Sequence, residues 1–454
     1  MKYIAEKNKF IYKIIGNQSV VDDAKYRLLN NVIIEKIDNY VLLYNLITDE
    51  LILLSQAEYA ALKEYDINNS NVATLIKEWF IVPEQFDDAQ FFNQIKSFAD
   101  IITDNESKKN GITDYIIFTT TDCNARCFYC YESGCSKISM TEAIANDVSN
   151  YIINKSNNNK VKIGWFGGEP LYNNKVIDII CLNLKKRNVE YSSSMVSNGY
   201  LFDEELLYKA VNLWKLKKVQ ITLDGTEEVY NRFKNYVYNE GSAYVRVINN
   251  IKKLLDIGIK VNIRLNMDEH NAENLHLLVD NLAEQFGNYD NIMVYTHLLF
   301  DNTSGGQQVK TDEQRHNLYK KMTDLKKHIV DKGLSGNPTL STNIMFNHCM
   351  ADSLSSTTIL PDGRLGKCEH YLEDNSWGSI YSDKEDLKVV NSFKKRYPDL
   401  ELCKSCPIRP RCIRLKKCPN EDNKCNNEIQ EYKIEGIKRQ MVNTYLKYLK
   451  ENNN

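Results

Sequence analysis

The sequence predicts an α/β protein whose main part is a partial (β/α)6 barrel, similar to a TIM barrel with fewer units. Two observations predict it. From Tyr115 to about residue 300, strand-like segments alternate with amphipathic helical segments. Directly after the first strand stands TTDCNARCFYCYE, residues 120–132, which places three cysteines where a barrel carries its reactive groups. With 454 residues, 43% of them hydrophobic, the chain is long enough for roughly two to four domains.

The predicted strands are short runs rich in β-branched and aromatic residues, at 114–121, 160–166, 190–197, 218–223, 260–266 and 291–300. Helical patterns lie between them at 141–155, 203–215, 243–258 and 272–287. Strands joined by helical crossovers form a parallel sheet with right-handed connections. Six such units fit an incomplete barrel better than a complete one of eight units. Reactive groups should then lie in loops at the carboxyl ends of the strands.

The segments before and after the barrel have patterns of their own. Residues 39–55 predict a hairpin with its turn at Thr48-Asp49, and helices follow at 56–65 and 71–80. The expected units are an N-terminal module at 1–105, the barrel at 110–305, a charged bridging helix at 306–340, a cysteine-rich domain at 341–428 and a C-terminal helix at 429–454.

Composition narrows the cellular setting. The 58 Lys and Arg residues nearly balance the 60 Asp and Glu residues, so bulk charge favours neither nucleic acid nor a membrane surface as partner. The first residues lack the apolar core of a signal peptide, and no apolar run is long enough to span a membrane, so we expect a cytoplasmic location. In that reducing compartment, twelve cysteines indicate metal or redox chemistry rather than disulfides.

The first cysteine group has the spacing Cys123-x3-Cys127-x2-Cys130. A structural zinc site takes four protein ligands, but no histidine near this loop completes such a set. The loop therefore predicts a metal centre with one open position, where a substrate or cofactor binds. Cys135 and Cys181 are expected to be thiols without a metal.

With the aromatic Tyr129 before its last cysteine, this loop resembles the cluster loop of radical S-adenosylmethionine (radical SAM) enzymes. In that family three thiolates hold a 4Fe–4S cluster, and the amino and carboxylate groups of S-adenosylmethionine chelate the fourth iron. The resemblance implies that Cys123, Cys127 and Cys130 are these ligands. It also implies a 5′-deoxyadenosyl radical that abstracts a hydrogen atom.

The segment WFGGEPL after the second strand matches the family's Gly-Gly-Glu-Pro segment at Gly167, Gly168, Glu169 and Pro170. In the family this backbone binds the methionyl amino group. Glycine allows a close backbone approach, and carbonyl and carboxylate acceptors suit an ammonium group. The alternative interpretation is a simple turn.

Two further segments extend the resemblance. VSNG ends the third strand with Ser197, where the family often has Thr-Asn-Gly. ITLDGTEEVYNRF follows the fourth strand and is similar to the family's Ser-x-Asp-Gly segment with a following arginine. By position, Thr222 and Asp224 are candidates to contact the ribose or methionyl polar atoms, and Arg232 to contact the carboxylate. A turn at Asp224 and a plain strand end at Ser197 are the alternatives.

A second cysteine zone resembles the SPASM domain, which carries two auxiliary 4Fe–4S clusters, so the resemblance implies three clusters in all. Its interleaved ligation would give the outer cluster and the inner cluster different cysteines: Cys403, Cys406, Cys412 and Cys425 for the outer, and Cys349, Cys368 and Cys418 for the inner. The five residues between Cys412 and Cys418 depart from the usual three. The inner cluster is one ligand short; His348 or a substrate thiolate are candidates. The alternative for the zone is a zinc knuckle.

The N-terminal hairpin and helices resemble the winged-helix element that captures leader peptides in ribosomally made natural-product pathways. An extended leader could add as a strand to an exposed hairpin edge. The alternative is a cap that stabilises the barrel.

Together these resemblances imply a peptide maturase that forms a thioether or carbon–carbon cross-link in a ribosomally made (RiPP) precursor peptide. A flavodoxin or ferredoxin would supply electrons. The second candidate is an anaerobic sulfatase-type maturase that oxidises a protein Cys or Ser to formylglycine. The third, an electron-transfer protein without catalysis, would need neither Gly-Gly-Glu-Pro nor an open cluster position.

Overall fold

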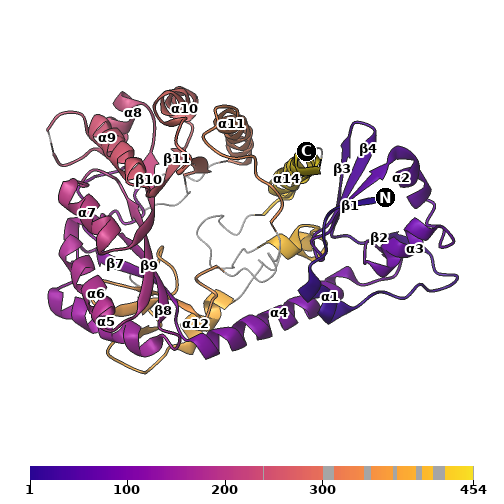
Figure 1. The fold of residues 1–454 in the computed structure, drawn as a ribbon, viewed down its shortest axis with the longest axis horizontal. Coiled ribbons are helices and arrows are strands. Elements are labelled where there is room, and N and C mark those ends of the chain that lie inside the picture. Colours follow the sequence, from indigo (N-terminus) through magenta and orange to yellow (C-terminus); the bar gives the residue numbers. More distant parts are fainter. Residues whose placement is uncertain are drawn as a thin grey trace.

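The computed structural model describes residues 1–238, 240–299, 311–341, 349–371, 376–394, 401–412 and 425–452. Cys418 and His348 lie outside these ranges. In Figure 1 the barrel and the N-terminal module occupy opposite ends of the molecule. Helix α4 (Asp88–Asn110) runs along the bottom of the view between them, while α11 (Asp312–Asp331) and α14 (Asn427–Asn452) lie along the top.

The N-terminal module contains a four-stranded antiparallel sheet and a smaller two-stranded one. The larger sheet has the order β1 (Lys2–Ala5), β5 (Leu51–Ser55), β4 (Tyr40–Asn45), β3 (Val32–Ile37), and the smaller pairs β2 (Tyr26–Leu28) with β6 (Ile81–Pro83). Three short helices accompany them: α1 (Lys9–Ile15), α2 (Gln56–Leu62) and α3 (Ser70–Lys77). The hairpin expected at 39–55 is present as β4 and β5.

The two middle strands of the larger sheet, β4 and β5, are buried on both faces, because they are apolar at consecutive positions. Val41 and Leu43 of β4 pack with the helices of the module. Leu42 and Tyr44 point to the other face, where they pack with Met441 of α14. The C-terminal helix therefore completes the core of the N-terminal module.

Helix α4 has no counterpart among the expected helices, although its ends carry standard signals. The Asp87 side chain accepts a hydrogen bond from the Gln90 amide at its start, and Gly111 ends it with φ 71°. Phe91 and Phe92 bury its first turns in the module. The helix runs continuously through residue 105, where the module was expected to end.

All six expected barrel strands are confirmed, and each hydrogen-bonds in parallel with its neighbour in chain order. They are β7 (Asp114–Thr120), β8 (Lys160–Gly167), β9 (Glu190–Ser197), β10 (Leu216–Leu223), β11 (Lys260–Met267) and β12 (Ile292–Leu298). Among the described residues β12 does not pair with β7, so the barrel is open. Its helices are α5 (Glu142–Lys155), α6 (Asn174–Lys186) with the preceding turn η1 (Pro170–Asn173), α7 (Glu204–Asn212), α8 (Glu227–Lys234), α9 (Ala243–Asp256) and α10 (Ala272–Phe286).

Alternation along the strands separates an apolar outer face from a more polar inner face. On β11, Val261, Ile263 and Leu265 belong to the core beneath the helices. Asn262 and Asn266 point to the opposite face and are nearly buried. The inner face of the barrel can therefore hydrogen-bond a ligand.

The C-terminal region continues the barrel sheet. Strand β13 (Ser356–Ile359) pairs in parallel with β7, and β14 (Arg364–Gly366) and β15 (Gly378–Ser379) extend the sheet to nine strands. The short helices α12 (Leu387–Lys394), α13 (Glu401–Lys404) and η3 (Arg409–Arg411) complete the region. Helix α11 packs Leu318 and Leu325 into the barrel core. In the part of the chain described, no helix is long and apolar enough to cross a membrane.

Met441→Ala tests the packing of α14 on the module. The Met441 side chain is fully buried, so its truncation should destabilise the protein by about 2–5 kcal/mol through lost contacts and a cavity. Leu446→Ala on the same helix is the matched control, because Leu446 is 45% exposed and its loss should change stability by less than about 0.5 kcal/mol. Denaturant unfolding followed by circular dichroism measures both; equal losses would contradict the packing described.

Candidate cofactor site

The three-cysteine loop begins immediately after β7, at the carboxyl end of the barrel strands. Cys123 and Cys127 pack against the barrel core, and the Cys130 amide donates to the Cys127 carbonyl over 3.2 Å. Burial raises the pKa of Cys123 to about 12 and of Cys130 to about 11, and it also raises the pKa of Cys127. A positive metal centre would stabilise these thiols as thiolates, so the donor set fits a metal cluster.

The two glycines of the Gly-Gly-Glu-Pro segment lie against this loop. A Cβ on Gly167, where φ is 133°, would stand 2.1 Å from the Thr120 carbonyl oxygen, and one on Gly168 would stand 2.3 Å from the Asp122 carbonyl oxygen. The Glu169 amide donates to the same Asp122 oxygen over 2.9 Å. The two backbone segments therefore lie so close together that neither glycine leaves room for a side chain. This contact fixes the start of the cysteine loop against the end of β8.

Glu169 and Ser197, both candidate cofactor residues, lie in contact. The fully buried Glu169 carboxylate accepts hydrogen bonds from Ser197 Oγ (2.9 Å), the Asn198 amide (2.8 Å) and the Leu171 amide (3.1 Å). Burial nevertheless raises the pKa of Glu169 to about 7. Pro170 starts the η1 turn, and its carbonyl accepts a hydrogen bond from Thr119. Glu169 therefore joins the ends of β8 and β9.

Tyr129, Asp224 and Lys234 form a buried polar group beside the cysteines. The Tyr129 hydroxyl donates to Asp224 Oδ2 over 2.5 Å, and Lys234 Nζ lies 3.1 Å from the same oxygen. Lys234 also donates to the Tyr129 hydroxyl over 2.8 Å. The side chains of Asp224 and Lys234 are 0% and 5% exposed. Burial opposes the charge on Lys234, but the nearby Asp224 and Tyr129 oxygens raise its pKa above the ordinary value.

Lys234 was missed by the sequence analysis, which selected Arg232. Arg232 is exposed, with its guanidinium 5.7 Å from the centre of the Phe233 ring. Lys234 ends α8, and its carbonyl accepts a hydrogen bond from the Arg126 amide inside the cysteine loop. Burial alone distinguishes Lys234 from the other lysines near helix ends. The sequence gives no sign of that burial, because lysines at the end of a charged helix are usually exposed.

Among the described residues, several buried acceptors in and beside the barrel interior lack a donor. Asp224 Oδ1 is buried and has no hydrogen-bond partner among the described residues, and the same holds for the Oδ1 atoms of Asn262 and Asn266. Thr222 lies on the inner face of β10, in register with Arg264 of β11. Buried acceptors normally have a donor. A ligand with hydroxyl or amino donors, such as S-adenosylmethionine, fits this need.

The second cysteine zone is partly described. Cys349 and Cys368 share a small apolar cluster with Phe393, so the structure brings together two of the three cysteines predicted for the inner cluster. Cys403, Cys406 and Cys412 lie in the short segment 401–412, and Cys425 precedes α14. Within the described ranges no three His, Cys, Asp or Glu side chains converge on a point as the ligands of a single metal ion do.

The two remaining cysteines have apolar neighbours. Cys181 is fully buried in the barrel core, and Cys135 packs beside Phe118 and Leu360.

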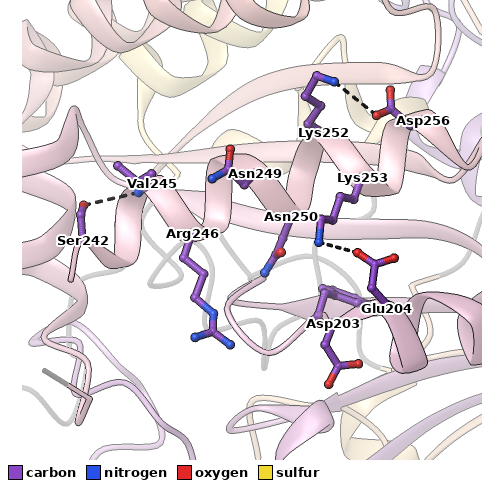
Figure 2. Close-up of a pocket in the computed structure, with 11 residues that line it drawn as sticks. Asp203, Glu204, Ser242, Val245, Arg246, Asn249, Asn250, Lys252, Lys253 and Asp256 are labelled. Carbon is purple, nitrogen blue, oxygen red and sulfur yellow. Dashed lines mark hydrogen bonds and ion pairs between the residues drawn. The ribbon is translucent and has the colours of Figure 1, made fainter. Parts of the chain in front are cut away.

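Figure 2 shows a surface cavity of about 900 Å³ behind the loop that follows β9. Arg246 and Asn250 of α9 both donate to the Tyr200 carbonyl, over 3.0 and 3.2 Å. Lys253 of α9 pairs with Glu204 of α7 over 2.6 Å. These contacts support the VSNG end of β9, and no cysteine of the cluster loop lines the cavity.

Comparison with known proteins agrees with this geometry. Residues 117–282 match the family model of the Radical SAM superfamily. An uncharacterized protein of Methanocaldococcus jannaschii, MJ0907, is 30% identical over 132 residues. That alignment covers 28% of this chain and 44% of the relative, so the chain spans less than half of the relative's length.

Two solved structures share the fold. A structure of anSMEcpe with bound AdoMet and Cp18Cys peptide has a TM-score of 0.53 at 16% identity, covering 75% of this chain and 97% of that one. Streptococcus suis SuiB bound to precursor peptide SuiA has a TM-score of 0.52 at 12% identity, covering 87% and 98%. Residues 117–282 therefore form a radical SAM domain, and the resemblance that the cysteine loop suggested is confirmed.

Gly168→Ala tests the contact between the Gly-Gly segment and the cysteine loop. Its Cβ meets backbone oxygen, so the loop must shift, and we expect loss of loop-bound iron and about 100-fold slower S-adenosylmethionine cleavage. Iron analysis and 5′-deoxyadenosine assay of the anaerobically reconstituted protein measure both. Gly336→Ala is the control, because its Cβ would meet open space. Wild-type iron and rate in Gly168→Ala would refute the contact.

Lys234→Met tests the buried ion pair. Removing the cation leaves Asp224 charged and buried, which should destabilise the protein by about 3–5 kcal/mol. Adding Asp224→Asn to the same chain should recover part of this loss, because the second change removes the unpaired charge. The exposed Lys217→Met is the matched control. Urea unfolding gives the values, and a loss no larger than that of Lys217→Met would speak against the pair.

Proposed function

We propose that this protein is a radical SAM peptide maturase that forms a thioether or carbon–carbon cross-link in a ribosomally made precursor peptide. The observation that carries the proposal is the convergence at one barrel end of the three-cysteine loop, the Gly-Gly-Glu-Pro segment and the buried acceptor Asp224. The pairing of β13 with β7 attaches a second thiol-rich region to the same sheet.

Three thiols would hold the first cluster: those of Cys123, Cys127 and Cys130. With S-adenosylmethionine bound there, the cluster, once reduced by one electron, would supply the radical chemistry that removes a hydrogen atom from the substrate. The protein's own part is to position the cofactor and exclude water. Asp224 Oδ1 can accept a ribose hydroxyl, and Thr222 lies on the adjacent inner position of β10.

The methionyl group has candidate partners on both sides. The backbone of Gly167 to Pro170 would accept the amino group. Glu169 would hold that backbone in place through its bond to Ser197 rather than through a bond to the cofactor. For the carboxylate, Lys234 offers a buried cation beside the cluster loop, and Arg232 offers an exposed one on the same helix.

Auxiliary clusters would occupy the second thiol zone. Cys349 and Cys368 lie in one group of packed apolar side chains. Together with Cys418 they would hold the inner iron–sulfur cluster. Cys403, Cys406, Cys412 and Cys425 would hold the outer one. Soft thiolate ligands select iron–sulfur clusters or zinc, and an iron and sulfide analysis separates these two cases.

The N-terminal module offers an edge for a leader peptide. Within the described residues, β4 is the one strand that pairs with β3, so β3 presents an edge to which an extended peptide could add. The similarity to SuiB, whose structure contains precursor peptide SuiA, covers a larger share of this chain than the similarity to anSMEcpe does. Both observations favour a leader-guided substrate. A flavodoxin or ferredoxin would deliver the electron.

Replacing Cys123, Cys127 and Cys130 together with Ala should abolish 5′-deoxyadenosine formation from S-adenosylmethionine and dithionite, because the cluster loses every protein ligand. Iron bound at the auxiliary sites should remain. Cys135→Ala is the matched control, since this thiol lies near the same loop but packs beside Phe118. Product formation by the triple variant would overturn the proposal.

The product identifies the reaction. A thioether made from a cysteine-containing precursor keeps its sulfur, whereas formylglycine made from cysteine has lost it. Mass spectrometry of a cysteine-containing candidate precursor peptide, after anaerobic turnover, separates the two outcomes. Loss of sulfur would assign the chain to the sulfatase-maturase type of reaction.

A further inference from the structure

The segment that carries three cysteines of the outer group docks on the N-terminal module. Asn30 Nδ2 donates to the Ser405 carbonyl over 2.9 Å, and Asn31 Nδ2 donates to the Pro407 carbonyl over 2.7 Å. These two carbonyls stand on either side of Cys406. Asn30 and Asn31 immediately precede β3, so the N-terminal module holds the backbone around this cysteine.

Arg411, the neighbour of Cys412, makes the second attachment. Its Nη2 donates to the Tyr44 hydroxyl over 2.6 Å and to the Ser341 carbonyl over 2.8 Å. Its Nη1 donates to Gln440 Oε1 of α14 over 3.1 Å. One guanidinium therefore joins the cysteine segment to the module and to the C-terminal helix.

The hydrogen bonds continue into the module. The Tyr44 hydroxyl donates to Asp49 Oδ1 over 3.1 Å, and Asn8 Nδ2 donates to Asp49 Oδ2 over 3.1 Å. The Asn8 side-chain oxygen also caps the first turn of α1. Tyr44, Asp49 and Asn8 are all less than a tenth exposed. This buried path links the hairpin turn of the module to the residue beside Cys412.

Apolar contacts strengthen the same attachment. Cys406 and Ile408 pack into the cluster formed by the module sheet and α14, with Ile408 only 5% exposed. The Arg409 guanidinium lies 5.1 Å from the centre of the Phe92 ring in α4. Every residue from 405 to 409 thus has a side chain or carbonyl held by the module or its helices.

We propose that the N-terminal module is part of the outer auxiliary-cluster site, and that Asn30, Asn31 and Tyr44 are positioning residues for the thiols of Cys406 and Cys412. The inference rests on the proposed function, because it takes an outer cluster to be bound there. The bonds fall on residues 405, 407 and 411, each next to a proposed ligand, so any shift of the module moves the ligands themselves.

This attachment should also affect the reduction potential of the outer cluster. Cluster potentials depend on hydrogen bonds to the sulfurs, solvent exposure and nearby charge. Arg411 brings a positive charge next to Cys412, and the Tyr44 hydroxyl fixes where that charge lies. Loss of the hydroxyl should therefore alter the reduction equilibrium of the outer cluster, although Tyr44 is itself no ligand.

Redox titration of the anaerobic full-length protein, followed by electron paramagnetic resonance, tests the proposal. Its outer-cluster signal is the one that disappears in Cys403→Ala/Cys406→Ala. Tyr44→Phe and Arg411→Lys should each shift the reduced-to-oxidised ratio of this signal about tenfold, which is about 59 mV for one electron. The signal of the first cluster should not move. Tyr40→Phe, 42% exposed on the same strand, and the exposed Arg439→Lys are the matched controls.

Asn30→Ala provides a second test in case Tyr44→Phe or Arg411→Lys does not fold. Asn30 is exposed, so its replacement removes one surface hydrogen bond. It should shift the same signal, whereas Asn39→Ala should not. An unchanged outer-cluster potential in folded Tyr44→Phe, Arg411→Lys and Asn30→Ala would overturn the inference. If Cys403→Ala/Cys406→Ala removed no signal, the outer cluster and this inference would both fall, while the 5′-deoxyadenosine assay would still test the first cluster.

Discussion

The buried contact between Asp224 and Lys234 is the constraint on which the candidate site depends. Two opposite charges away from water are stable only when each satisfies the other and their remaining hydrogen bonds are made. Tyr129 supplies the third member, and it lies between two of the cluster cysteines. The pair therefore requires the cysteine loop, the end of β10 and the end of α8 to meet in one place. Burial of these charges makes the loop part of the barrel's folded core.

A second constraint joins the thiol-rich region to the barrel. The pairing of β13 with β7 places the region's first hairpin beside the strand that leads into the cysteine loop. Cys368 follows β14 by two residues, and the Tyr131 ring of the cysteine loop lies 4.6 Å from the His370 ring. The two regions thus touch through residues adjacent to their cysteines. A ligand held between them would be near both groups of cysteines.

The sequence predicts the structure correctly where a local residue pattern determines it. The six barrel strands were predictable because their outer faces alternate apolar residues with a period of two, and the cysteine loop because its spacing is short and local. Helix α8 was missed since it is short and half of its residues are charged, and α4 because its charged second half hides the apolar start. The β13–β7 pairing and the burial of Lys234 depend on residues far apart in the chain, which no local pattern records.

The N-terminal module shows why attachment matters for function. Strand β4 is apolar at consecutive positions because both of its faces are covered, one by the module's own helices and the other by α14. A module built only to hold a peptide and move freely would present a polar face to water. Here the second face is closed by the end of the chain, and the cysteine segment 401–412 is held at the margin of that interface. The N-terminal module, helix α14 and the cysteine segment 401–412 therefore form a single packed unit. Within it, the residues that bond the backbone around Cys406 lie directly before the edge strand β3.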